Sequence, residues 1–269
     1  MTPSEADSDP DLRLTRLVTL AARQPDIKTD VEANHDDNRW WPTQVTDLRM
    51  RMLVAGWSTR ISYTMIGHYS RVVTRSAAIG FDQLARMPDP QIASLVAPLG
   101  LPAARISYLR SLTAFLDGHD TRYLLHADAT AVIATFAAQV TQASYKVAQC
   151  ALLYARGYHC GIIPVDSGMV TRLAPALGLR LTAGPAAHEQ MRRYLETHAA
   201  TNGSRYRQLL RRHEHEVTVP QDTTPSWWLH LTLIYFKRRY LNHAHPRVCP
   251  HRPVCDQVMD CQHSPAATT

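Results

Sequence analysis

Apolar residues recur every three to four positions along most of this chain, which is the spacing that gathers them on one face of an α-helix. Prolines and glycines stand mainly at the ends of these periodic segments, where they can begin or stop a helix. The polar segment 26–42 carries no such period and is predicted to be a loop. Helices are predicted over residues 12–22, 46–55, 61–76, 81–85, 90–99, 102–117, 129–138, 144–155, 167–176, 188–199, 204–215 and 227–240.

The pattern therefore predicts an all-α fold, because no stretch sustains the alternation of apolar and polar residues that marks a half-buried strand. Residues 1–10 are polar and acidic, so they are predicted to be a disordered tail. They have neither the basic start nor the apolar stretch of a secretory signal. No apolar run approaches the roughly 20 residues needed to cross a bilayer. We therefore expect a cytoplasmic protein with no membrane partner.

The charge balance favours a polyanionic partner such as nucleic acid, since the formal net charge is +6 and the isoelectric point lies near 9.2. Many basic proteins bind no nucleic acid, so charge alone decides little. The basic residues concentrate toward the C-terminus, where they predict either a phosphate-contacting surface or a merely solvated one. They are Arg192, Arg193, Arg205, Arg207, Arg211, Arg212, Lys237, Arg238 and Arg239.

The most informative short run surrounds Asp166, which follows the apolar approach Gly161-Ile162-Ile163-Pro164 and precedes a predicted helix. An aspartate at this place is typical of a helix N-cap, because its carboxylate accepts backbone N–H groups that lack a helical partner. A carboxylate at the same place can also do chemistry. The two roles are compatible.

The run resembles the V-D-T/G-x-hydrophobic-x-R-hydrophobic signature of the helix-hairpin-helix DNA glycosylases, in which the aspartate is the catalytic carboxylate. Gly168 and Met169 vary from the signature. For this chain the resemblance implies Asp166 as the essential carboxylate of base excision. The matching residues are Val165, Asp166, Val170, Arg172 and Leu173.

Upstream, residues 140–148 resemble the family's L-P-G-V-G-x-K-T-A hairpin, whose backbone N–H groups bind DNA phosphates. The resemblance implies DNA contacts at Gln142, Ser144 and Tyr145, although Gln142 and Ser144 replace the two hairpin glycines. Lys146 matches the lysine that attacks the sugar as an amine nucleophile in family members that have it. The alternative interpretation of Lys146 is a solvated helix lysine.

Residues 53–60 resemble the family's L-L-S-x-Q-T/A-x-D stretch, whose glutamine fills the gap left by a flipped base. Trp57 occupies the glutamine position. An aromatic side chain can stack in a vacated base site, which implies a DNA contact for Trp57. The alternative is a tryptophan of the protein core.

The three cysteines at the C-terminal end, Cys249, Cys255 and Cys261, read as metal ligands rather than as disulfide partners. They resemble the C-x6-C-x2-C-x5-C cluster of endonuclease III relatives, which implies a [4Fe-4S] cluster with one non-cysteine ligand. Cys249 aligns with either the first or the second family cysteine. Zinc, or a lost site without metal, are the alternatives. The histidines that can supply the missing ligand are His243, His245, His251 and His263.

Together these matches identify the chain as a divergent endonuclease III-like glycosylase, and they imply two helical domains with duplex DNA bound between them. One domain, which corresponds to the family's six-helix domain with the altered hairpin, spans 46–165; the other joins 11–45 to 166–261, and residues 262–269 form a tail. The implied function is excision of a damaged, modified or mispaired base by a monomer, with lyase activity if Lys146 is the nucleophile. The alternative is a non-catalytic DNA-binding protein that keeps the scaffold. A structural or regulatory protein without nucleic acid fits the basic helices poorly.

Overall fold

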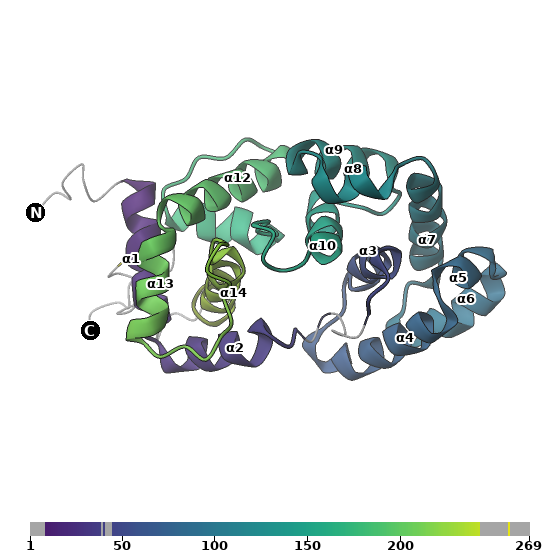
Figure 1. The fold of residues 1–269 in the computed structure, drawn as a ribbon, viewed down its shortest axis with the longest axis horizontal. Coiled ribbons are helices and arrows are strands. Elements are labelled where there is room, and N and C mark those ends of the chain that lie inside the picture. Colours follow the sequence, from purple (N-terminus) through teal and green to yellow (C-terminus); the bar gives the residue numbers. More distant parts are fainter. Residues whose placement is uncertain (1–8, 39, 41–44, 243–257, 259–269) are drawn as a thin grey trace, which may run out of the picture. The chain divides into compact units, whose positions relative to one another are not determined.

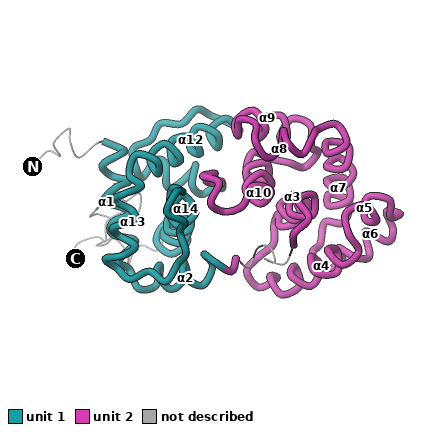
Figure 2. The backbone as a smooth tube through the Cα atoms, viewed as in Figure 1, with its two compact units in different colours: residues 1–36, 165–269 teal, residues 37–164 magenta. Residues whose placement is uncertain are grey.

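The computed structural model describes residues 9–38, 40, 45–242 and 258, and every regular element within them is a helix (Figure 1). The predicted all-α class is thereby confirmed. The chain divides into two compact units: unit 1 comprises residues 1–36 and 165–269, and unit 2 comprises residues 37–164 (Figure 2). No helix in the described part of the chain is both long enough and apolar enough to span a bilayer.

Unit 2 is built around α3 (Leu48–Trp57) and α10 (Tyr145–Arg156), which pack against each other over most of their lengths. Seven of the ten residues of α3 and eight of the twelve residues of α10 are buried. The other helices of the unit are η2 (Tyr63–Met65), α4 (Ile66–Ile79), α5 (Phe81–Arg86), α6 (Asp89–Val96), η3 (Ala97–Leu99), α7 (Pro102–Asp117), α8 (Thr121–His126) and α9 (Ala129–Gln139). Of these, α7 packs on α3, α8 and α9 pack on α10, and the remaining helices pack mainly on one another and on α7.

A glycine in α3 allows α7 to approach closely. The hydroxyl of Tyr108 on α7 donates a hydrogen bond of 2.8 Å to the Met52 carbonyl. A Cβ atom at Gly56 would lie only 2.2 Å from Cε1 of the Tyr108 ring. Any larger residue at position 56 would therefore push α7 away from the core.

Unit 1 is centred on α14 (Ser226–Phe236), all of whose residues are buried. α14 packs against α1 (Pro10–Ala22), α2 (Pro25–His35) and α12 (Ala186–Thr201). The chain then continues into a π-helical turn, η5 (Lys237–Leu241), which packs on a second one, η4 (Met169–Leu173). The unit is completed by α11 (Ala174–Ala176) and α13 (Gly203–Arg212).

The loop predicted over 26–42 is wrong for its first part, because α2 is a helix. Ile27 and Val31 lie one turn apart, and both are fully buried. At its end, the indole N–H of Trp227 donates a hydrogen bond of 3.0 Å to the His35 carbonyl. Two apolar residues among acidic neighbours are too few for a visible period, so packing against α14 decides the conformation.

The short helix α8 was also missed by the pattern. The Asp120 carboxylate caps its start by accepting the Arg122 N–H at 3.0 Å. Arg156 on α10 donates to the carbonyls of Leu124 and Ala127 at 2.9 and 2.6 Å, and so satisfies the other end. A helix of six residues is too short to show a period, and its stabilising partner lies far along the chain.

Candidate functional site

Asp166 stands directly before the helical residues Ser167 and Gly168, which continue into η4, and it follows a segment in which Ile163 and Val165 are buried. Its carboxylate oxygen Oδ1 accepts the Met169 N–H at 2.8 Å, so Asp166 caps the helix. Its other oxygen, Oδ2, accepts a hydrogen bond from the Lys237 ammonium group. The Asp166 side chain keeps 16% of its surface exposed. The carboxylate is therefore fixed in place and still reaches the surface.

Lys237 is the residue that the sequence interpretation misplaced, since it was grouped with the surface cations. Its side chain is only 4% exposed and forms an ion pair with Asp166. A Cβ atom at Gly168 would lie 3.0 Å from the Lys237 Nζ atom and 3.1 Å from its Cδ atom. Gly168 thus leaves the room that Lys237 occupies beside the start of η4. The signal for this pair was a lysine directly after the apolar run of α14.

The arginine of the same motif makes a second tie between η4 and η5. The Arg172 guanidinium donates a hydrogen bond of 2.6 Å from Nη1 to the Leu241 carbonyl. The Asp166–Lys237 pair lies at the start of η4 and the Arg172 contact lies near its end. The two motif side chains therefore hold η5 against η4, which fixes the surroundings of the carboxylate.

In unit 2, α9 and α10 are joined by a tight turn over residues 140–144. Gln142 adopts the left-handed conformation, with φ of 67°, at the position where the family hairpin has a glycine. The Ala143 N–H donates to the Val140 carbonyl at 3.0 Å. The Ser144 hydroxyl accepts the Val147 N–H at 3.4 Å and caps α10. The backbone thus makes a glycine-like turn without glycine.

The turn rests on α7 through one serine. The Ser111 hydroxyl accepts the Thr141 N–H at 2.8 Å and donates to the Gln139 carbonyl at 3.2 Å. Beyond this support, the side chains of Gln142, Ser144 and Lys146 are exposed, and Tyr145 is half-buried. Lys146 belongs to unit 2 and Asp166 to unit 1. The DNA contacts of the hairpin and the nucleophile role of Lys146 stay predictions.

Trp57 lies in the core of unit 2, with none of its surface exposed. Its indole N–H donates a hydrogen bond of 3.1 Å to the Arg105 carbonyl, and the Arg105 guanidinium donates in return to the Trp57 carbonyl. A side chain with no exposed surface has no route to a base in DNA. The core interpretation of Trp57 therefore replaces the predicted DNA contact.

Arg105 joins two surface segments of unit 2, the loop after α3 and the turn before α7. The guanidinium donates to the carbonyls of Thr59, Leu99 and Gly100 at 3.2, 3.0 and 2.8 Å. The residue is only 3% exposed, and burial lowers the pKa of its guanidinium from the ordinary value. It works as a buried clamp made of charge-assisted hydrogen bonds to backbone carbonyls.

At these two segments the backbone adopts conformations that ordinary residues avoid. Leu101 has φ of 52° and Arg60 has φ of 58°, and both side chains are exposed. Leu101 is 47% exposed and is one of two exposed large apolar residues in the described part of the chain. Strained non-glycine residues of this kind cluster at functional sites. Periodicity carries no information on φ, so the pattern of apolar residues could not reveal these two conformations.

The basic residues near the C-terminus fall into two groups. Arg192 is buried and pairs with Glu189 and Glu196. Arg239 pairs with Asp30. Arg207 donates to backbone carbonyls of residues 219–223, and Arg238 lies 5.4 Å from the centre of the Tyr235 ring. The exposed arginines that pair with no carboxylate among the described residues are Arg193, Arg205, Arg211 and Arg212.

The predicted metal ligands Cys249, Cys255 and Cys261 lie outside the described residues, as do the histidines proposed to join them. Within the described ranges, no group of three or more histidine, cysteine, aspartate or glutamate side chains is arranged to hold a metal ion. An iron-sulfur cluster, zinc or no metal thus remain the predicted alternatives.

Comparison with protein-family models, with curated proteins and with solved structures finds no match. The resemblance to the glycosylase family therefore rests on the motif residues alone. What the chain does has to be inferred from those residues and from their geometry.

Proposed function

We propose that the chain is a DNA N-glycosylase of the helix-hairpin-helix type, which releases a damaged, modified or mispaired base that has been flipped out of duplex DNA. The observation that carries the proposal is the Asp166 carboxylate, fixed at a helix start by Met169 and Lys237 and still partly exposed. Electrostatic catalysis needs a charge that is held in place before the reaction begins. Asp166 meets that requirement.

Breaking the bond between base and sugar builds positive charge on the sugar. A carboxylate nearby stabilises that charge and can also take the proton from the attacking water. The Lys237 ammonium favours the ionised carboxylate, which is the form that both tasks require. Arg172 holds the neighbouring turn against movement. In this chemistry Asp166 is the catalytic residue and Lys237 a positioning residue.

Unit 2 supports the DNA-binding half of the proposal. An exposed apolar side chain on a tight turn is the kind of wedge that proteins insert between base pairs to unstack them. Leu101 has this form, and the Arg105 clamp holds its turn. The hairpin at Gln142, whose counterpart in the family binds phosphate, is exposed, with Ser144 and Tyr145 beside it. Leu101 thus takes the DNA-contacting role that was predicted for Trp57.

Two parts of the proposal need tests of their own. Lys146 is exposed on the first turn of α10, so its amine is accessible for attack on a sugar. If it is the lyase nucleophile, borohydride traps a covalent adduct with abasic DNA, and Lys146→Ala abolishes trapping. For the three cysteines, the absorbance of anaerobically purified protein distinguishes a [4Fe-4S] cluster from zinc or from no metal.

The central test uses Asp166→Asn on duplexes that contain uracil, oxidised, alkylated or mismatched bases. Asparagine also caps helices well, so the fold is expected to survive. We expect base release to fall about a hundredfold or more, which is typical for removal of one electrostatic stabiliser. DNA binding should change little. Circular dichroism and a duplex-binding assay of the same variant serve as controls.

The alternative, a non-catalytic DNA-binding protein, is favoured by one specific observation. Both oxygens of Asp166 are engaged in contacts that stabilise the fold, namely the Met169 N–H and Lys237. A carboxylate with these partners can be conserved in a chain for structure alone. If the wild-type chain binds duplex DNA but releases no base from any of the substrates, the alternative replaces the enzyme.

A further inference from the structure

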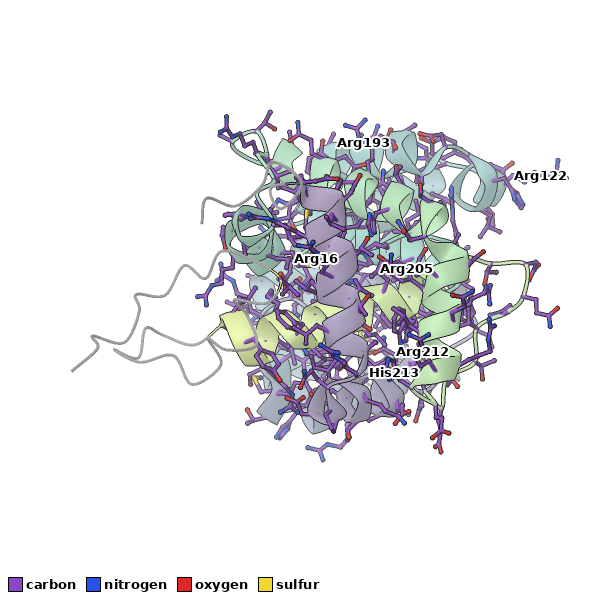
Figure 3. The ribbon with its side chains drawn as sticks, turned by 90° about the vertical axis from the view of Figure 1, so that its left-hand side faces the viewer. Arg16, Arg122, Arg193, Arg205, Arg212 and His213 are labelled. Carbon is purple, nitrogen blue, oxygen red and sulfur yellow. The ribbon has the colours of Figure 1, made fainter. Side chains whose placement is uncertain are left out.

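α1 and α13 lie side by side on the surface of unit 1, tied together near both ends by histidines (Figure 3). Near their starts, the Nε2 atom of His198 lies 2.6 Å from the Tyr206 hydroxyl, and its Nδ1 atom lies 3.3 Å from the Asp11 carboxylate. Near their ends, the Nε2 atom of His215 lies 2.8 Å from the Ala22 carbonyl. The two helices therefore run in the same direction and present neighbouring outer faces.

Both outer faces carry arginines at the same spacing. Arg16 and Arg23 are seven residues apart on and directly after α1, and Arg205 and Arg212 are seven apart on α13. Seven residues make nearly two turns, so each pair points the same way about 10 Å apart along its helix. All four residues are exposed. Figure 3 looks onto this face and labels three of them, Arg16, Arg205 and Arg212.

The surroundings of His213 show that the cations converge at the lower end of this face. Burial lowers the pKa of His213, and the positive charges of Arg212, Arg23 and Lys28 lower it further. These three cations come from three different elements. Acidic groups are present as well: Glu32 pairs with Lys28 at 3.7 Å, Glu214 adjoins His213, and Asp11 lies at the other end.

The chemistry of the face selects one class of partner. Arginine forks match phosphate oxygens in a bidentate way, and α13 carries no acidic residue to compete for them. The exposed large apolar residues of the described chain are Tyr63 and Leu101, and both belong to unit 2. The face therefore has no large apolar side chain with which a protein would anchor itself in a lipid surface.

We propose that α1 and α13 form a second nucleic-acid-binding face, on which Arg16, Arg23, Arg205 and Arg212 contact backbone phosphates of duplex DNA. It is separate from Asp166, which is held by η4 and η5. The inference goes beyond the proposed function, because a phosphate contact at this face needs neither Asp166 nor base excision. These contacts would raise the affinity of the chain for DNA without contributing sequence specificity.

The test measures affinity of the full chain for an unmodified DNA duplex over a series of salt concentrations by fluorescence anisotropy. In the variant Arg16→Gln/Arg23→Gln/Arg205→Gln/Arg212→Gln, the slope of log K against log salt should become shallower by about 3 to 4, since each lost phosphate contact removes about 0.9. The matching four Arg→Lys substitutions should keep most of the slope, because lysine also contacts phosphate. Circular dichroism checks that both variants fold.

The control removes the same charge from exposed arginines of unit 2, in Arg71→Gln/Arg75→Gln/Arg86→Gln/Arg122→Gln. An equal loss of slope in this control overturns the proposal, because the effect is then one of net charge. An unchanged slope in the first variant also overturns the proposal. So does a result in which the first variant loses binding to phosphatidylserine vesicles but keeps the salt dependence of its DNA binding. If the wild-type chain releases no base from any substrate but the first variant shows the expected loss of salt dependence, the proposed enzyme activity is wrong and the proposed DNA-binding face is supported.

Discussion

Asp166 in unit 1 is mostly buried, capped onto a helix and paired with a buried lysine, whereas Leu101 and Gln142 in unit 2 are exposed on strained turns. The first arrangement holds a charge still. The second holds backbone in a conformation that leucine and glutamine avoid when nothing compels it. Both arrangements lower the free energy of unfolding. A buried ion pair costs desolvation of its two charges, and a left-handed residue costs steric strain.

The difference separates two tasks. A reacting centre needs a fixed charge, because reorganising it during the reaction would raise the barrier. A surface that distorts DNA needs exposed groups on supported turns, because the binding energy must be spent on unstacking bases. In this chain two of the supports are themselves buried, Lys237 beside Asp166 and Arg105 beside the turn at Leu101, whereas Ser111, which supports the turn at Gln142, is half-buried.

The largest effect is expected from Lys237→Met, which removes the ammonium and leaves the Asp166 carboxylate poorly compensated. The free energy of unfolding should fall by about 3 kcal/mol, the usual result of breaking one side of a buried pair. Urea denaturation measures it. In Asp166→Asn/Lys237→Met no charge is left without a partner, so the double variant should be more stable than Lys237→Met. A loss below about 1 kcal/mol in the single variant would mean that the pair does not fix the carboxylate.

Leu101→Gly should separate stability from function in unit 2. Glycine relieves the left-handed strain of the folded chain, which raises the free energy of unfolding. It also increases the conformational entropy of the unfolded chain, which lowers it, so a net gain of about 0.5 kcal/mol is expected. Base release, or DNA distortion measured by energy transfer between duplex ends, should drop about tenfold because the wedge is lost. Tyr63→Gln is the matched control, since it removes the other exposed large apolar side chain. Equal losses in the two variants would contradict a specific wedge.

Gln142→Gly should raise stability about as much as Leu101→Gly does and should have a smaller effect on DNA binding. The gain is expected to be about 0.5 kcal/mol, because φ of 67° suits glycine better than glutamine. Closer approach of a phosphate to the turn should tighten duplex binding about twofold. Gln142→Ala provides the comparison, since alanine shares the left-handed penalty. If alanine and glycine behave alike in thermal unfolding and in anisotropy, the turn is not strained in solution.

The sequence predicted those parts of the molecule that depend on long apolar periods. The prediction over 102–117 coincides with α7, and the predicted ranges around α9 and α10 are within one residue of the observed ones. It failed where a helix is short or polar, as in α8 and α2, because tertiary contacts decide those segments. The predicted domain 46–165 covers most of the observed range 37–164 of unit 2, and the C-terminal boundaries differ by one residue.

For the candidate site, local motifs were sufficient to find Asp166 and its cap but not its partner. Lys237 follows Asp166 by seventy-one residues and approaches it only through the packing of η5 on η4. The same limit explains Trp57. A motif can align a side chain with a family position, but whether that side chain is buried depends on α7, which contributes Arg105 from forty-eight positions further along. Leu101 was not predicted as a candidate residue, because its strain lies in its backbone angles, which the pattern of apolar residues does not reveal.

The smallest expected effect is a dependence of local stability on pH, which should be larger in unit 1 than in unit 2. Burial lowers the pKa of His198 from its ordinary value of 6.5, although the hydrogen bond with Asp11 acts in the opposite direction. Burial also lowers the pKa of His215, although its contact with the Ala22 carbonyl acts in the opposite direction. Both histidines join α1 to α13 in unit 1. When pH falls through 6.5, the unfolded chain binds protons that the folded chain refuses, so this stabilisation is present above that pH and is lost below it.

Hydrogen exchange by mass spectrometry, corrected for intrinsic rates, can compare protection of α1 and α13 with that of α3 and α10 at about pH 7.5 and pH 5.5. We expect α1 and α13 to lose more protection on acidification. In His198→Gln the hydrogen bond to Tyr206 can be kept without a titrating ring, so the pH dependence of α1 and α13 should weaken even if the variant is less stable overall. An equal loss in both units, or an unchanged dependence in His198→Gln, would show that these histidines do not control the pairing of the two helices.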